Sequence, residues 1–143
     1  MRASDNMRRV RQFLDLVVSG KDYDLWGGML AEDAERLTPF VPPGLPTITK
    51  GRVACVNGAR EIFKSIKAFR WIDLDLHETD EPDVIYGTSK SAVELTDGRH
   101  YENDYVFIFK FANGLIREFR EYLNPIPVME CFASELASGE WES

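Results

Sequence analysis

The sequence predicts an α+β domain in which helices come first and an antiparallel sheet follows. Apolar residues recur at helical spacing up to about Phe69, and they alternate with polar residues from Trp71 to Leu123. Clusters of turn-forming residues separate the alternating segments, which is typical of strands joined as a meander. The 143 residues fit a single domain, in which we expect residues 1–6 and 134–143 to be frayed.

Charge and composition limit the classes of function. Lys and Arg total 17 against 24 Asp and Glu, so the net charge is −7. A chain this acidic is repelled by phosphate, which argues against nucleic acid or an anionic membrane as the partner. No apolar segment reaches the length of a membrane helix, and the N-terminus lacks the apolar stretch of a signal peptide. We therefore expect a cytoplasmic protein in which Cys55 and Cys131 pack as small apolar side chains.

Three helices are predicted before the sheet. Apolar stripes at helical spacing place them at about 7–18, 25–30 and 58–69. Ser19-Gly20 ends the first helix, and Trp26 belongs to the apolar stripe of the second.

A proline-rich loop separates the second and third predicted helices. Residues 39–51 hold four of the seven prolines of the chain. The loop also carries apolar residues, including Phe40, so it is too apolar for a solvated linker. We expect it to fold back onto the domain over the mouth of a pocket.

Four strands follow the helices, and their alternation places them at 72–77, 84–95, 101–111 and 115–123. Hairpin turns at 96–99 and 112–114 connect the last three strands. Beyond Pro125 we predict no further element.

The strand 101–111 places aromatic and polar side chains on one face: Tyr101, Asn103, Tyr105, Phe107, Phe109 and Phe111. Two interpretations stay open. The face packs against the helices as core, or Tyr101, Asn103 and Tyr105 line a cavity with a few placed hydrogen-bonding groups. Both can hold along one strand, with packing at one end and a pocket at the other.

Glu121 is the candidate acid/base group. If the last strand is regular, Glu121 shares a face with Arg117 and Phe119, while Ile116 and Tyr122 lie on the opposite face. A carboxyl group among aromatic rings suits proton transfer, because burial disfavours its charged form. The alternative is that Glu121 is exposed and pairs with a neighbouring arginine.

Other candidate groups carry weaker signals. Glu61 and Ser65 are four residues apart on the third predicted helix and could reach a cavity beneath it. His77 and His100 have no neighbour at metal-ligand spacing, so we predict no metal site. The chain has no nucleotide-binding or nucleophile motif, and we predict no cofactor.

Three segments carry a family resemblance: Tyr101–Tyr105, Phe109–Arg117 and Arg120–Tyr122. They resemble the end of SnoaL-like members of the nuclear-transport-factor-2-like superfamily. Glu78–Pro82 and Ser65–Phe69 bring the pattern closest to the phenazine-biosynthesis A/B proteins. The resemblance implies a cone-shaped, curved antiparallel sheet that packs on three N-terminal helices and encloses a pocket, as in cystatin-like folds.

The resemblance also implies roles for single residues. Glu121 matches the acidic residue that handles a proton in the phenazine proteins, and Ser65 matches the serine of their third helix. Glu61 departs from the pattern, because those proteins have a histidine there. Thr38 and Phe107 stand where ketosteroid isomerases carry two catalytic aspartates, so steroid isomerisation by that mechanism is not expected.

These observations lead to two functional hypotheses. The first is a cofactor-independent enzyme that isomerises, dehydrates, cyclises or condenses a small ring-containing metabolite. Glu121 moves the proton, Ser65, Tyr101, Asn103 and Tyr105 contact the substrate, and the apolar walls are Trp26, Phe40, Phe63, Trp71, Phe107 and Phe119. The second is a non-catalytic domain that binds an apolar or aromatic metabolite or serves dimerisation.

A homodimer is expected from the family resemblance and from the opposite face of the long strand. That face carries Val106 and Ile108, which could pair with a second copy. They could equally pack under the C-terminal segment.

Overall fold

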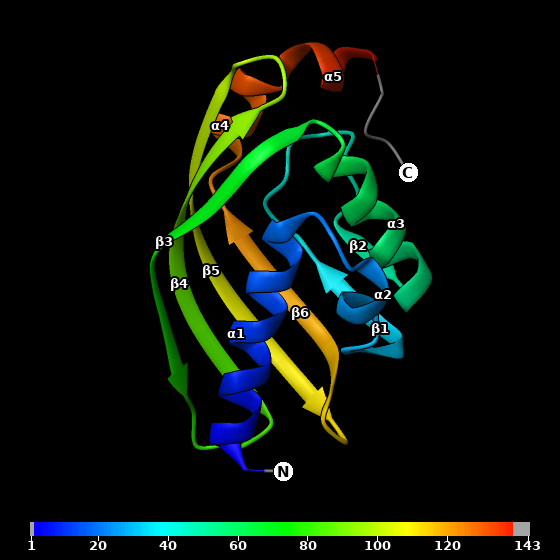
Figure 1. The fold of residues 1–143 in the computed structure, drawn as a ribbon, viewed down its shortest axis with the longest axis vertical. Coiled ribbons are helices and arrows are strands. Elements are labelled where there is room, and N and C mark those ends of the chain that lie inside the picture. The colour runs from blue at the N-terminus through cyan, green and yellow to red at the C-terminus, as the bar shows by residue number, and fades with distance from the viewer. Residues whose placement is uncertain (1, 139–143) are drawn as a thin grey trace.

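The computed structural model describes residues 2–138 (Figure 1). Its elements run in the order α1 (Ala3–Ser19), α2 (Tyr23–Gly27), β1 (Leu30–Leu37), β2 (Ile48–Lys50), α3 (Arg52–Phe63), β3 (Ile66–Glu78), β4 (Val84–Leu95), β5 (His100–Ala112), β6 (Leu115–Leu123), α4 (Pro125–Cys131) and α5 (Ala133–Ser138). The α+β fold class predicted from the sequence is confirmed.

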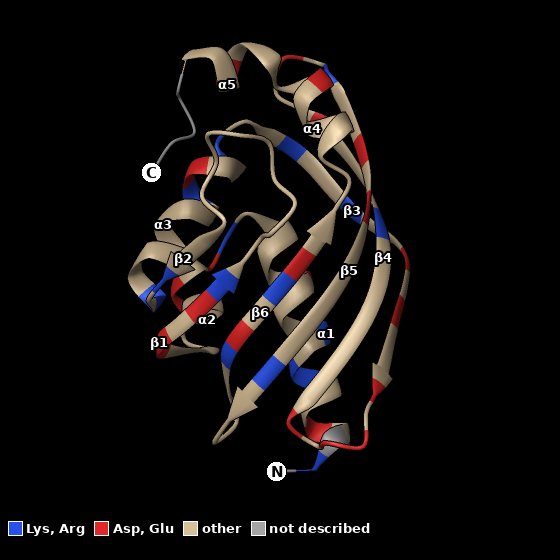
Figure 2. Cartoon of the chain, turned by 180° about the vertical axis from the view of Figure 1, so that it is seen from behind, with Lys and Arg blue, Asp and Glu red and all other residues tan. Residues whose placement is uncertain are grey.

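One six-stranded sheet organises the domain, with the strand order β2-β1-β6-β5-β4-β3. Neighbouring strands are antiparallel except β1 and β6, which run parallel. The helix α1 packs across one face of the sheet, which we call the inner face (Figure 1). Figure 2 shows the molecule from the opposite side, where β4, β5 and β6 lie in front of α1, and we call this face of the sheet the outer face.

The first helix forms the base of the core. Phe13 of α1 stacks on Trp26 at 4.8 Å between ring centroids and meets Phe109 and Phe119 edge-on at 5.7 and 5.3 Å. Gly20 ends the helix with a φ of 64°, a left-handed conformation that glycine adopts without steric cost. This helix is confirmed, and it begins earlier than its apolar stripe suggests.

The third helix lies earlier in the chain than predicted. It ends at Phe63, and the segment 66–69 instead begins β3. The prediction failed because apolar residues at 62, 63, 66 and 69 have helical spacing, although the chain turns between the two pairs. Phe69 follows the strand period instead, since it packs at 4.7 Å from Trp71 on the same face.

Two strands were missed, β1 and β2. In β1 the fully buried residues are Leu30 and Ala34, whose spacing of four is typical of a helix. A register shift between Leu30 and Glu35 breaks the alternation that would have indicated a strand. The short β2 lies within the predicted loop 39–51 and pairs with β1.

The last three strands agree with the sequence prediction, while β3 is longer than predicted. A register shift between Ile72 and Asp75 of β3 includes Asp73, whose φ is 56°. Just beyond this irregularity, Gly87 of β4 pairs with Leu76 and lies so close to β3 that an added Cβ would come within 2.8 Å of the Asp75 carbonyl oxygen. A glycine in β4 therefore permits the close approach of β3 at its bend.

Helices lie near both ends of the described residues. Helix α1 includes residues 3–6, and the buried Asn6 donates from Nδ2 to the Pro82 carbonyl oxygen at 2.9 Å. After β6 the helices α4 and α5 extend to Ser138. Residues 1 and 139–143 lie outside the described residues.

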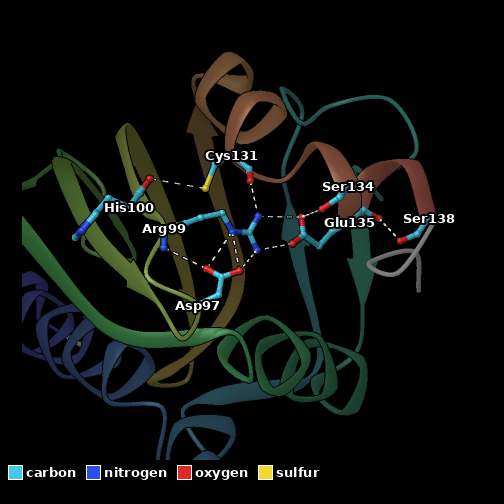
Figure 3. Close-up of polar contacts among 7 residues, drawn as sticks. All are labelled: Asp97, Arg99, His100, Cys131, Ser134, Glu135 and Ser138. Atoms are coloured by element: carbon cyan, nitrogen blue, oxygen red, sulfur yellow. Dashed lines mark hydrogen bonds and ion pairs between the residues drawn. The ribbon is translucent and has the colours of Figure 1, made fainter.

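Arg99, in the β4–β5 hairpin, holds the two C-terminal helices (Figure 3). Its Nη1 donates to the Cys131 carbonyl oxygen at 2.6 Å, and its Nη2 donates to Glu135 Oε1 at 2.6 Å. Asp97 orients the guanidinium from the hairpin through bonds to Nε. Phe132 packs beside Tyr101, an inner-face residue of β5. The helices α4 and α5 are therefore fixed to one end of the inner face.

We expect Arg99→Gln to loosen this attachment, because one guanidinium supplies the hydrogen bonds to both helices. Amide hydrogens of α5 should exchange with solvent several-fold faster, while those in the centre of β5 keep their protection. Lys64→Gln is the control, since it removes an exposed cation whose partner is Glu61. Unchanged exchange in α5 would show that apolar packing alone holds the helices.

Acidification should loosen the same attachment. Hydrogen bonds from Arg99 hold the pKa of Glu135 and Asp97 below their ordinary values of 4.5 and 3.8. A depressed carboxyl pKa adds stability above the unfolded-state value, and that stability is lost as the pH falls through the folded-state value. Protection of α5 should therefore persist at neutral pH and decline below those ordinary values, and Arg99→Gln should remove the decline.

Candidate functional site

The inner face of the sheet has a middle section between two ends, and different helices cover each end. Helix α1 covers the end that carries Phe109 and Phe119. Helix α4 and the adjoining Phe132 cover the end that carries Tyr101, where Val128 and Phe132 pack. The residues that combine polar groups with aromatic walls lie between these ends.

Trp71 of β3 forms the aromatic wall of this middle section. It meets Tyr105 and Phe107 edge-on, each at 5.3 Å, and Phe69 at 4.7 Å. Its Nε1 donates to the carbonyl oxygen of Leu14 at 3.1 Å, which fixes the indole against α1. Phe63 extends the row, because its ring lies 5.9 Å from Phe69. The structure therefore brings together the predicted wall residues of α3, β3 and β5.

Glu121 of β6 points to the inner face. It lies opposite Phe107 in the β5–β6 register, two residues after the buried Phe119. Its side chain is 21% exposed. The prediction that Arg117 shares this face is wrong: a bulge in β6 places the buried Ile116 opposite Phe111 instead.

Arg36 of β1 pairs with Glu121, and sequence reasoning missed it. Its Nη2 donates to Glu121 Oε2 at 3.1 Å, and its side chain is 27% exposed. Burial lowers the pKa of the guanidinium, but the charge and hydrogen bond of Glu121 outweigh that effect and raise it above its ordinary value. Sequence periodicity carries no signal for this contact, because it depends on the pairing of β1 with β6.

Two buried tyrosines of β5 complete the polar part of the site. Ser91 Oγ donates to the Tyr105 hydroxyl at 3.2 Å, and Asn103 Nδ2 donates to the Tyr101 hydroxyl at 2.6 Å. Burial raises the pKa of both phenols, and the negative charge of Glu121 contributes further. Both hydroxyls therefore stay neutral and can donate hydrogen bonds at physiological pH.

Asn103 belongs to the framework rather than to the free surface of the site. Its Nδ2 donates to the Tyr101 hydroxyl at 2.6 Å and to the Asn124 carbonyl oxygen at 2.9 Å. Its Oδ1 accepts from the amides of Asn124 and Asp104 at 3.0 and 2.8 Å. Asn103 thus joins β5 to the start of α4 and holds Tyr101, and its amide is fully used.

Three predicted contact residues lie elsewhere. Ser65 is in the turn after α3, where its backbone bonds to Ile62 and Thr96, so its assignment to a helix is wrong. Phe40 is 58% exposed and packs against Tyr122 on the outer face, so it does not line the inner site. Trp26 is buried in the core against Phe13, although its Nε1 has no hydrogen-bond partner within residues 2–138.

The sheet also has a shallow concavity of about 350 Å³ on its outer side. It is lined by Asp73, Thr88, Ser89, Lys90, Asp104, Tyr105, Val106 and Tyr122. Its outer-face lining residues lie across the sheet from Glu121, so this concavity and the Arg36–Glu121 pair are separate features.

Sequence and structure comparisons establish the family. The SnoaL-like domain matches residues 10–119, and the chain belongs to this family. A PhzA/B-like protein of Pseudomonas aeruginosa is 26% identical over 103 residues, which cover 71% of this chain and 72% of that protein.

Two solved structures show the same fold. A Bacillus subtilis protein described provisionally as an isomerase superimposes with a TM-score of 0.80 at 21% identity, covering 93% of this chain and 96% of that one. The phenazine biosynthesis-related protein PhzB2 of P. aeruginosa superimposes with a TM-score of 0.74 at 19% identity, covering 92% and 89%. The nuclear-transport-factor-2-like fold with its curved sheet is thereby confirmed.

Two kinds of feature are absent from residues 2–138. No three His, Cys, Asp or Glu side chains in this part of the chain converge on a position that could hold a metal ion. No helix within it has the length and hydropathy needed to cross a membrane.

We expect each single substitution in the Arg36–Glu121 pair to lower the free energy of unfolding more than the double substitution does. Glu121→Gln or Arg36→Met alone leaves a half-buried partner without its countercharge, which should cost about 1–3 kcal/mol of unfolding free energy. The double variant Arg36→Met with Glu121→Leu should recover most of that loss. Urea unfolding measures each value, and Glu61→Gln in the exposed Lys64 pair is the control. Additive losses would contradict direct coupling.

Proposed function

We propose that this protein is a cofactor-independent enzyme that performs acid/base chemistry on a small ring-containing metabolite bound at the inner face. One observation carries the proposal. The carboxylate of Glu121, held by Arg36, shares the inner face with the neutral hydroxyl of Tyr105 and the ring of Trp71, and its negative charge acts on the hydroxyls of both Tyr105 and Tyr101. A base, a hydrogen-bond donor and an aromatic wall therefore lie in one place.

The chemistry that suits this arrangement is proton transfer next to a carbonyl group. Glu121 would take a proton from the carbon beside the carbonyl, and the electron pair of that C–H bond would move to the carbonyl oxygen. A tyrosine hydroxyl would donate a hydrogen bond to the oxygen as it becomes negative. Return of the proton to another carbon completes an isomerisation, while loss of a β-hydroxyl group as water completes a dehydration.

The hydrogen-bond pattern leaves two candidate donors, the hydroxyls of Tyr101 and Tyr105. The Tyr101 oxygen accepts from Asn103, and the Tyr105 oxygen accepts from Ser91. Because each oxygen already accepts a bond, the hydrogen of each hydroxyl remains to be donated to a ligand. The names of the similar proteins, a provisional isomerase and two phenazine-related proteins, are consistent with small-molecule chemistry.

A non-catalytic binding domain is the second candidate. It is favoured because Asn103 is fully hydrogen-bonded within the chain and Ser65 lies in a turn, which removes two of the expected substrate contacts. The remaining aromatic wall would suffice to bind an apolar ring, with the Arg36–Glu121 pair at one side.

Glu121→Gln decides between the two functions. In an activity screen over cyclic ketones and hydroxyketones, the enzyme proposal predicts a loss of kcat of roughly 10²–10⁴-fold, with ligand affinity largely retained. Glu118→Gln is the matched control, because Glu118 lies on the same strand and pairs with Arg120 and Lys110 on the outer face. Unchanged turnover in Glu121→Gln would contradict the catalytic role. Ring binding without any turnover would support the binding domain.

We further propose that a second copy of the chain covers the outer face. Val106 is 41% exposed there, and the C-terminal helices pack on inner-facing residues instead of covering it. The outer face carries both signs of charge, as in the register partners Lys90 and Asp104 (Figure 2). Two copies facing each other could therefore match acids with bases around an apolar centre.

Val106→Glu should prevent this association, because it places a charge at the centre of the contact. The wild-type chain should elute as a dimer in size-exclusion chromatography with light scattering, and the variant as a monomer. Val53→Glu is the control, since Val53 is an exposed residue of α3. A wild-type monomer at all concentrations would contradict the proposed dimer.

A further inference from the structure

We propose that Asn103 is a positioning residue that makes Tyr101 a fixed hydrogen-bond donor at the inner face, and that the backbone at the start of α4 sets the orientation of Asn103. This inference rests on the proposed function, because it assumes that a ligand with a carbonyl group meets Tyr101. It adds which of the two tyrosine hydroxyls is committed to that ligand, and it gives the start of α4 a part in binding.

The side-chain amide of the buried Asn103 can face in only one direction. Its Oδ1 lies 3.0 Å from the backbone nitrogen of Asn124 and 2.8 Å from that of Asp104. Backbone N–H groups donate and cannot accept, so an oxygen rather than an NH₂ group must stand at this position. Two backbone donors therefore determine which end of the amide faces Tyr101.

The end of the amide that faces Tyr101 is the NH₂ group, which donates and does not accept. Nδ2 lies 2.6 Å from the Tyr101 hydroxyl oxygen and 2.9 Å from the Asn124 carbonyl oxygen, so each of its two hydrogens has an acceptor. The Tyr101 oxygen must therefore accept from Asn103, and its own hydrogen is directed away from Asn103. This contact reserves the Tyr101 hydrogen for another acceptor.

Tyr105 has no such restriction. Its partner is the hydroxyl of Ser91 at 3.2 Å, and each of two hydroxyl groups can donate to the other or accept from it. The direction of this bond can reverse when a ligand approaches, so Ser91 competes with the ligand for the Tyr105 hydrogen. Of the two contacts, only that of Tyr101 with Asn103 has a direction that the structure fixes.

Asn124 links this arrangement to α4. It precedes the helix and caps it, since its Oδ1 accepts from the backbone nitrogen of Ile126 at 3.1 Å. Both contacts of Asn124 with Asn103 use backbone atoms instead. Phe132, directly after α4, packs against the Tyr101 ring with 5.3 Å between centroids. Displacement of the start of α4 would remove two of the bonds that hold the amide, and the Tyr101 hydrogen would lose its fixed direction.

A fixed donor favours a ligand that presents an acceptor, and a carbonyl oxygen accepts without carrying a hydrogen of its own. The charge of Glu121 acts on the Tyr101 hydroxyl, so the proposed base and the donor are close enough to serve one ligand. A donor that needs no reorientation stabilises an oxygen that becomes negative during proton transfer. We therefore expect the site to distinguish a cyclic ketone from the hydrocarbon of the same shape.

The test uses 2-acetylnaphthalene and 2-isopropenylnaphthalene, which have the same shape and differ in the carbonyl oxygen, in calorimetric titrations of the full chain. Tyr101→Phe should weaken binding of the ketone by roughly 3- to 10-fold and leave binding of the hydrocarbon unchanged. The effect of Tyr105→Phe on the ketone should be smaller. Tyr122→Phe is the matched control, because it removes a hydroxyl from the outer face. In the infrared spectrum, the carbonyl band of the bound ketone should lie at higher frequency in Tyr101→Phe, because the hydrogen bond that weakens the C=O bond is lost.

Two substitutions test the positioning role of Asn103. Asn103→Asp keeps the oxygen that accepts from the backbone but replaces the NH₂ group by an oxygen that takes the Tyr101 hydrogen. It should change ketone affinity and the carbonyl band as Tyr101→Phe does. Asn124→Pro removes the N–H that Oδ1 accepts, and the φ of −84° at this position is close to that of proline. It should cause part of the same change, while Asn124→Ala, which also loses the cap but keeps the N–H, should not. Circular dichroism checks that each variant is folded.

Each outcome bears on the inference. Ketone binding that depends on Tyr105 as much as on Tyr101, or on neither, would overturn it and leave the ring-binding site of the proposed function intact. A carbonyl band that stays unchanged in both Asn103→Asp and Asn124→Pro would overturn the positioning role, and equal effects of Asn124→Pro and Asn124→Ala would overturn the part given to the backbone of α4. Failure of both compounds to bind would overturn the inference together with the proposed site. A Tyr101-dependent and Asn103-dependent ketone contact without turnover of any cyclic ketone would support the inference while contradicting the proposed catalysis.

Discussion

The parallel pairing of β1 with β6 brings together two halves of the site that lie 85 residues apart in the sequence. Every other strand pair in the sheet is an antiparallel pairing of consecutive strands. The parallel pair has no such local connection, because the chain passes through β2, α3 and the whole meander before it returns. Closing a loop of that length costs conformational entropy, and contacts between β1 and an already formed meander are needed to offset it. We therefore expect the β3–β6 meander to form first and the Arg36–Glu121 contact to form late.

How well the sequence predicts each strand depends on how regularly buried and exposed residues alternate along it. In β5 every second residue from Tyr101 to Phe111 is buried, so the sequence alone defines both the strand and its inner face. In β1 a bulge interrupts the alternation, and the buried Leu30 and Ala34 have helical spacing. The predicted end of the third helix was wrong for a related reason. The apolar residues at 62 and 63 and those at 66 and 69 have helical spacing, although a turn separates the two pairs.

The sequence predicted site residues only where the pattern of a single strand determines the direction of the side chain. The inward direction of Glu121 follows from counting two residues beyond Phe119. The contact of Arg36 with Glu121 depends on the pairing of β1 with β6, which sequence periodicity does not reveal. The framework role of Asn103 depends on the Asn124 backbone, in a segment where no element was predicted. A polar residue on a pocket face can thus be a ligand contact or an internal connector, and alternation does not distinguish the two.

The close approach of β3 to Gly87 has a consequence for how this fold tolerates sequence change. An added Cβ at position 87 would meet the side chain of Leu76 as well as the Asp75 backbone. A smaller residue at position 76 would relieve only the first contact, because the second involves main-chain atoms. In a saturation library, position 87 should therefore accept glycine alone and resist rescue by second-site changes at Leu76. A designer who wishes to widen the inner site would have to change the bend in β3 itself.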